Sequence, residues 1–233
     1  MDELCFTEHS DYDVPTVVNC DYDAYFKEME EMKEKYKGQI TLKTGIEFGI
    51  QVHTTKAYEE TFGQYPFDFV IFSCHQVENK EYWRQEPQKG KTQLEYNRRY
   101  YQEILDVVKA YKDYSILGHL DVIKRYDLNG EIELEKIKDL IEQIFEVVIA
   151  DGKGIELNTS SRAYHLKSLM PSREILELYH DMGGKIITIG SDAHNADRVG
   201  DRVMESQKIL KEIGFNGIYT FDQMKPKFHE FKF

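Results

Sequence analysis

The sequence lacks an excess of basic residues. Its 30 lysines and arginines are outnumbered by 42 aspartates and glutamates, which gives a formal net charge of −12 and an isoelectric point near 5.2. Proteins that follow a nucleic-acid backbone carry a basic stripe, so this balance argues against nucleic acid as the main partner. The acidic excess is interpreted as a solvated surface. An anionic small molecule stays open as a ligand, because metals and a few arginines can make one pocket locally positive.

Cysteine pairs and long apolar stretches are also missing. Cys5, Cys20 and Cys74 are odd in number and show no C-x-x-C spacing. Because Cys5 and Cys74 fall in predicted strands, we expect them to be reduced core thiols of a cytosolic protein. No apolar stretch reaches the length of a membrane span, and Met1–Glu3 carries the wrong charge for a signal peptide. We therefore expect a soluble, cytoplasmic protein with no membrane partner.

The chain has no linker, low-complexity segment or block of like charge, so residues 1–233 are expected to form a single domain. Short apolar runs alternate with helical patterns, which favours an α/β fold with a parallel sheet or barrel. The helical patterns cover residues 22–36, 56–62, 92–111, 134–150, 171–183 and 202–213, with Pro171 in a first turn. The polar segment 76–90, which contains the only tryptophan, Trp83, is predicted to be a long loop over the functional site.

Five short apolar runs each lead into side chains that can bind a metal: His9, Glu47, His75, His119 and, after the last run, Asp192 with His194. Runs of this length are typical of buried parallel strands, whose carboxyl ends converge on one mouth of a barrel. A single histidine after a strand is more often structural. However, half of the eight histidines occupy this one kind of position, which favours a site for two or more divalent metals. The others are interpreted as surface or structural residues: His53, His165, His180 and His229.

These five runs, together with a sixth at 155–160, form motifs that resemble, in order, those of the polymerase-and-histidinol-phosphatase (PHP) family of metal-dependent phosphoesterases, and most closely its histidinol-phosphatase branch. The motifs are Thr7-Glu8-His9-Ser10-Asp11, Gly45-Ile46-Glu47, Ser73-Cys74-His75, Gly118-His119-Leu120-Asp121, Ile155-Glu156-Leu157-Asn158-Thr159-Ser160 and Gly190-Ser191-Asp192-Ala193-His194. The resemblance implies a distorted (β/α)7 barrel, similar to a TIM barrel, with up to three divalent ions (zinc, manganese or iron). It also implies hydrolysis of a small phosphate monoester, L-histidinol phosphate.

The resemblance further implies roles for individual residues. The metal ligands would be His9, Glu47, His75, His119, Asp192 and His194. Among them Glu47 and Asp192 would be catalytic, Glu47 as a bridging carboxylate and Asp192 as a ligand that also orients the attacking water.

Three arginines follow strand ends that bear site residues: Arg125, Arg162 and Arg198. Their guanidinium forks suit phosphate oxygens, although each one alone could be a solvated loop charge. Glu156 and Asn158 are candidates to receive the ammonium or imidazole of the substrate, and a structural role is the alternative for Glu156. The arginines would thus bind the phosphate group of the substrate, and Glu156 and Asn158 its ammonium or imidazole.

One departure from the family pattern stands out. Members open with a strand that carries a His-x-His pair, and this chain has no such pair. Roughly one βα unit, about 30 residues, is expected to be absent, so that the barrel would be incomplete at its amino-terminal end. We therefore expect the chain as given to be a poor histidinol-phosphatase, either as a fragment or as a naturally degenerate version. The alternatives are a PHP phosphoesterase with another small monoester substrate, or a metal-binding protein without turnover.

Overall fold

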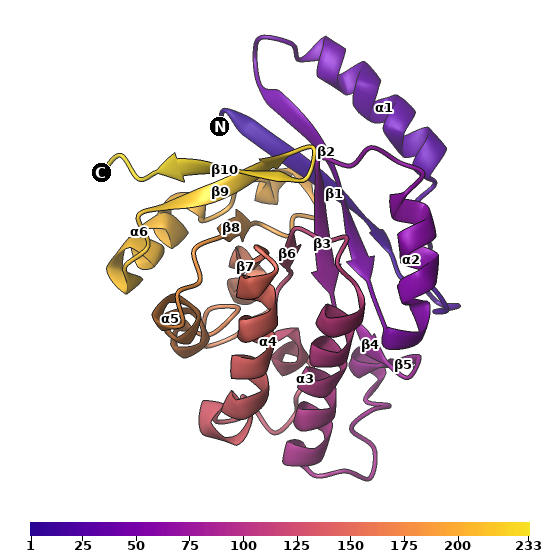
Figure 1. The fold of residues 1–233 in the computed structure, drawn as a ribbon, viewed down its shortest axis with the longest axis vertical. Helices are drawn as coiled ribbons and strands as arrows, with labels where there is room; N and C mark the ends of the chain where they lie inside the picture. Colours follow the sequence, from indigo (N-terminus) through magenta and orange to yellow (C-terminus); the bar gives the residue numbers. More distant parts are fainter.

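The computed structural model describes residues 1–233, and its centre is a curled sheet of six parallel strands (Figure 1). The order across the sheet is β1-β2-β3-β6-β7-β8. These strands are β1 (Glu3–Ser10), β2 (Thr41–Gly49), β3 (Phe69–Ser73), β6 (Ile116–Leu117), β7 (Gly154–Asn158) and β8 (Ile187–Gly190). The predicted α/β fold with a parallel sheet is confirmed. The sheet is a half-barrel, because β1 pairs only with β2 and β8 only with β7.

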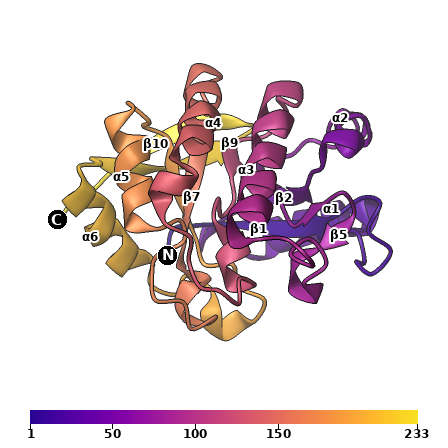
Figure 2. The same cartoon turned by 90° about the horizontal axis from the view of Figure 1, so that it is seen from below.

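Six helices connect and cover the strands. They are α1 (Tyr22–Lys35), α2 (Thr55–Phe62), α3 (Gln93–Ala110), α4 (Lys138–Ala150), α5 (Arg173–Asp181) and α6 (Val203–Ile213). Helices α3 and α4 lie side by side, and Figure 2 shows α5 and α6 at one end of the molecule and α1 and α2 at the other. Apolar residues of α3, α4 and β7 form a large part of the core, among them Ile104, Val107, Ile141, Ile144, Phe145 and Leu157.

Local sequence signals explain where these elements begin. All five residues of β3 are buried, as expected for a central parallel strand. Thr92 caps α3 in a reciprocal pair with Glu95, which satisfies two amide groups at the start of the helix. Helix α5 begins after Ser172, whose side chain accepts from the amide of Ile175. The prediction that Pro171 lies in the first turn is therefore wrong: Pro171 precedes the cap, since serine is the better capping residue.

The last two strands form a separate antiparallel hairpin, β9 (Gly217–Asp222) and β10 (Lys225–Glu230). This hairpin is therefore not part of the parallel sheet. Lys43 Nζ lies 2.5 Å from Asp222 Oδ1, and the rings of Phe69 and Phe221 are 5.1 Å apart. These contacts place the hairpin near the amino-terminal ends of β2 and β3, away from the end at which the predicted site residues lie.

The predicted loop 76–90 is more ordered than expected. It contains a small hairpin, β4 (Gln76–Val77) and β5 (Lys80–Glu81), followed by a 3₁₀ turn, Tyr82–Arg84. Two glutamine amides beyond this turn donate to the carbonyl of Tyr126, from Gln85 at 2.6 Å and from Gln88 at 3.5 Å. The segment is therefore tied to the loop that follows β6. None of the helices combines the length and the apolar character needed to cross a lipid bilayer.

Candidate metal centre

The six predicted site residues come from the carboxyl ends of the parallel strands. His9 in β1 and Glu47 in β2 are direct partners in the register of the sheet. The remaining four follow the ends of β3, β6 and β8: His75, His119, Asp192 and His194. Because the strands are parallel, these residues lie at the same edge of the sheet. The structure therefore brings together the residues that the sequence singled out.

Glu47 lies at the centre of this group. Its Oε1 is 3.0 Å from His75 Nε2 and 2.9 Å from His119 Nε2, and its Oε2 is 3.5 Å from His9 Nε2. Ser73 Oγ also donates to Oε1, at 2.7 Å. Burial opposes ionisation of Glu47, but the neighbouring imidazoles, above all His9 and His119, outweigh it and hold its pKa well below the usual range. Glu47 is therefore an ionised carboxylate shared by three histidines.

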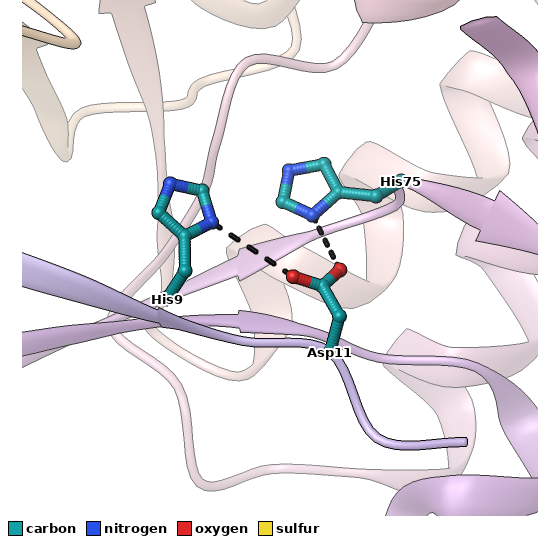
Figure 3. Close-up of side chains that lie close together, drawn as sticks. All are labelled: His9, Asp11 and His75. Carbon is teal, nitrogen blue, oxygen red and sulfur yellow. Dashed lines mark hydrogen bonds and ion pairs between the residues drawn. The ribbon is translucent and has the colours of Figure 1, made fainter. Parts of the chain in front are cut away.

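Asp11, which was not among the predicted site residues, belongs to the same group (Figure 3). His75 Nδ1 donates to Asp11 Oδ1 at 2.7 Å, and His9 Nδ1 lies 3.9 Å from Oδ2. Burial opposes ionisation of Asp11, yet the charge and hydrogen bond of His75, together with those of His9, lower its pKa. The signal was present in the sequence, because Asp11 follows His9 by two positions and so shares its face of the strand.

A glycine on the neighbouring strand makes room for Asp11. A Cβ atom at Gly49 would overlap the Asp11 carboxylate. On the other side of the pair, burial opposes the charged form of His75, but Asp11 and Glu47 outweigh it and raise its pKa well above the usual value. Asp11 therefore holds the His75 ring through Nδ1 and leaves Nε2 turned toward Glu47.

Asp192 forms the other side of the centre. Its Oδ1 lies 3.2 Å from His194 Nε2, and its Oδ2 accepts from Arg125 Nη2 at 2.8 Å and from Ser160 Oγ at 3.0 Å. Burial opposes ionisation, but the charges of His119 and Arg125 outweigh it and lower the pKa of Asp192. The rings of His9 and His194 are 5.8 Å apart, which connects this pair to the histidines around Glu47.

Two residues of the centre have an unusual backbone. His119 and Asp192 adopt positive φ angles of 40° and 48°, a region that residues other than glycine rarely enter. Such a conformation costs about 1–3 kcal/mol and persists where the surrounding structure enforces it, often at functional sites. Both residues are the second position after a strand end. The backbone therefore turns sharply there, and packing must hold these side chains in place.

The donor atoms fit a divalent metal. Two groups of three side chains, His9 with Asp11 and His75, and Glu47 with His75 and His119, place potential ligand atoms within 4.8 Å of one another. Imidazole nitrogens and carboxylate oxygens are the donors that zinc, manganese and iron accept in proteins. A carboxylate bound to the far nitrogen of a ligand histidine, as Asp11 is bound to His75, is the usual outer partner of such a ligand.

The structure separates the three predicted phosphate-binding arginines. Arg125 is largely buried at the centre, with its guanidinium carbon 3.9 Å from the middle of the Tyr164 ring. Arg198 Nη2 donates to the carbonyl of Ser191 at 3.1 Å, next to Asp192. Arg162 is exposed, and its side chain makes no hydrogen bond or ion pair within the protein. Only Arg125 therefore contacts the candidate metal centre directly.

Two cavities border the centre. One, of about 280 Å³, is lined by the site histidines and Arg125 together with apolar and aromatic residues, among them Val17, Val122, Ile123, Trp83, Tyr126 and Tyr164. The second, of about 480 Å³, lies between β1 and β8 and is lined in part by Glu156 and Asn158. Burial, followed by the charges of Glu47 and Asp192, raises the pKa of Glu156 to about 8. The centre thus opens toward an aromatic pocket and toward a cleft that contains a buried acid.

The chain belongs to the PHP family, because the family model described as "PHP domain" matches residues 1–160. This confirms the resemblance drawn from the motifs. Among individual proteins, the chain is 30% identical over 230 residues to the histidinol-phosphatase of Lactococcus lactis subsp. lactis (strain IL1403), covering 97% of this chain and 85% of that protein. A probable histidinol-phosphatase of Clostridium acetobutylicum is 26% identical, covering 93% of this chain and 84% of that protein.

Solved structures agree with the sequence relatives. The crystal structure of histidinol phosphate phosphatase from Lactococcus lactis, complexed with zinc, L-histidinol and phosphate, superposes with a TM-score of 0.87 at 29% identity. The match covers 97% of this chain and 88% of that chain. A putative histidinol phosphatase from Listeria monocytogenes has a TM-score of 0.71 at 16% identity, with 88% of each chain covered, and shows the shared fold.

Proposed function

We propose that this chain is a histidinol-phosphatase, a phosphoric monoester hydrolase that converts L-histidinol phosphate into L-histidinol and inorganic phosphate in histidine biosynthesis. The observation that carries the proposal is the ionised Glu47 carboxylate, which faces three imidazoles beside a buried arginine. The similarity to the Lactococcus lactis enzyme, whose structure contains zinc, L-histidinol and phosphate, supports this choice of substrate. Under this proposal, the partner of the chain is a small phosphate monoester.

The proposal includes divalent ions, up to three in number and drawn from zinc, manganese and iron. Their ligands would be His9, Glu47, His75, His119, Asp192 and His194. Such ions, when bound, supply the positive charge that stabilises phosphoryl oxygens and makes water a nucleophile near neutral pH. The donor chemistry supports the assignment, because imidazole nitrogens and ionised carboxylates are present in the same group.

The protein side chains position the reacting groups. Glu47 remains ionised and holds the histidine rings around one point, while Asp192 orients the attacking water. Arg125 binds phosphate oxygens from the buried wall of the pocket, where its charge faces little competing solvent. Arg162 and Arg198, which follow the neighbouring strand ends, are proposed as the outer members of the same phosphate clamp. Residues 1–233 would act together as one phosphoesterase domain of the distorted (β/α)7 type.

Phosphate release tests the proposal. Protein supplied with zinc or manganese is assayed against L-histidinol phosphate and a panel of other small phosphate monoesters. We expect histidinol phosphate to have the highest kcat/KM. Substitution His75→Gln should abolish turnover because His75 contacts both Asp11 and Glu47, whereas His53→Gln, at a half-exposed histidine outside the centre, should not. Equal turnover across the panel would favour another monoester substrate, and no release from any monoester would contradict the enzymatic function.

A further inference from the structure

Two chemically different groups of residues line the smaller cavity. One group belongs to the candidate metal centre, with Arg125 beside it. The other includes three partly exposed aromatic side chains, Trp83, Tyr126 and Tyr164, which we call the aromatic wall. Trp83 and Tyr164 keep 40% and 43% of their surface exposed, although large aromatic rings are usually mostly buried. Exposed aromatic rings that line a pocket beside charged groups are typical of a ligand-binding surface.

The aromatic wall is held in place by polar contacts. The rings of Trp83 and Tyr126 lie 6.2 Å apart at an angle of 59°. The amide of Gln85, two positions after Trp83, donates to the carbonyl of Tyr126 at 2.6 Å, and Gln88 reaches the same carbonyl. The segment that carries Trp83 is thus fastened to the loop that carries Tyr126. The two rings therefore form a preformed surface that a ligand need not order on binding.

Tyr164 has a different contact. Its ring lies under the guanidinium of Arg125, 3.9 Å from the guanidinium carbon, while Arg125 Nη2 bonds to Asp192. Tyr164 therefore supports the arginine that faces the phosphate. This leaves Trp83 and Tyr126 as the part of the aromatic wall that is available to the rest of a bound molecule.

We propose that Trp83 and Tyr126 bind the ring of the leaving alcohol, and so make the enzyme selective for phosphate monoesters whose alcohol carries a flat heteroaromatic ring. The inference rests on the proposed function, because it takes the phosphoryl group to bind at the metal centre and Arg125. A flat ring gains from stacked or edge-on contact with aromatic side chains, and a protonated ring gains further from their negative faces. An aliphatic alcohol of similar size would make neither contact.

The single tryptophan provides a direct binding signal. Trp83 is the only tryptophan in the chain, so its fluorescence reports on the aromatic wall without interference. The zinc-loaded protein is titrated with L-histidinol and, in parallel, with alaninol, an amino alcohol that lacks the ring. We expect a saturable change in fluorescence with L-histidinol and none with alaninol. No response to L-histidinol, or equal responses to both alcohols, would overturn the inference.

Kinetics provide the second measurement. Substitution Trp83→Ala should lower kcat/KM for L-histidinol phosphate by about tenfold relative to that for glycerol phosphate, mainly through KM, and Trp83→Phe should restore most of the loss. Phe228→Ala removes a comparably exposed aromatic ring from β10, outside this cavity, and should leave the ratio of the two kcat/KM values unchanged. A ratio that stays within twofold in Trp83→Ala would overturn the inference while the proposed function stands. A wild type inactive on L-histidinol phosphate would contradict the function, and the fluorescence titration would still decide whether the wall binds the ring.

Discussion

Replacing Glu156 with glutamine should stabilise the metal-free protein, and by more at pH 8 than at pH 5. Glu156 is 4% exposed in β7, and its carboxylate accepts a hydrogen bond from Asn158 Nδ2 at 3.1 Å. Burial, with the charges of Glu47 and Asp192, raises its pKa from 4.5 to about 8. Glutamine has the same shape and can accept the same hydrogen bond, but it has no proton to lose.

The sign of the effect follows from the pKa of the folded state. Between about pH 4.5 and pH 8 the unfolded chain has an ionised Glu156, whereas the folded protein keeps it protonated. The folded state then binds more protons, so stability falls as the pH rises through this window and levels off above it. One pKa unit corresponds to about 1.4 kcal/mol, so the cost at pH 7 is at most about 3.5 kcal/mol. The glutamine variant does not carry this cost.

Urea unfolding of chelator-treated protein at pH 5, 6, 7 and 8 measures the effect. The free energy of unfolding of Glu156→Gln should exceed that of the wild type by a margin that grows by about 1 kcal/mol per pH unit. Glu59→Gln is the matched control, because Glu59 is an exposed carboxylate on α2 and should show no such growth. A margin that does not change with pH, or that shrinks as the pH rises, would refute the reasoning.

Three further results are expected. Asp11→Asn should weaken zinc binding by about 10- to 100-fold in competition with a chromophoric chelator, because the carboxylate that holds His75 is lost; unchanged affinity would remove Asp11 from the site. Arg125→Lys should raise the KM for phosphate monoesters by about tenfold, since lysine lacks the planar fork; unchanged KM values in the lysine variants of Arg125, Arg162 and Arg198 would reject the phosphate clamp. Removal of metal should lower the Tm, and added zinc should restore it. Zinc at 100 times its Kd should raise the free energy of unfolding by about 2.7 kcal/mol. A Tm that does not change with added zinc would contradict metal binding by the folded protein.

The positions of the site residues could be predicted because one rule covers them. Each lies at or just beyond the end of an apolar run, and parallel strands bring such ends together whatever the connecting loops do. Asp11 also lies just beyond the end of such a run, but its contact with His75 depends on another strand: Gly49 must lack a side chain for the Asp11 carboxylate to reach His75. The sequence contains both residues, but it does not indicate that they touch.

The arginines show where prediction from sequence stops. Arg125 and Arg198 each lie eight residues after a strand end, that of β6 and that of β8, yet only Arg125 contacts the centre, through Ser160, Asp192 and the ring of Tyr164. Those contacts depend on how two loops pack, which residue spacing does not determine. The hairpin of β9 and β10 is a similar case. Its first strand looks like one more strand of a β-α repeat, and its antiparallel pairing appears only when the next residues turn back.

The charge balance of the centre links metal binding to protons. Asp11, Glu47 and Asp192 stay ionised although they are buried, and buried charges persist only when they have partners. In the protein alone, these partners are Arg125 and the histidines. The pKa values of His9 and His75 are both raised, and the charge of Glu47 is the largest cause for His9. A histidine binds a metal only in its neutral form. A divalent ion can therefore bind there only as these histidines lose their protons. The carboxylates that favour the ion also favour the protons that compete with it, and the affinity for metal must therefore rise with pH through the range in which these histidines titrate.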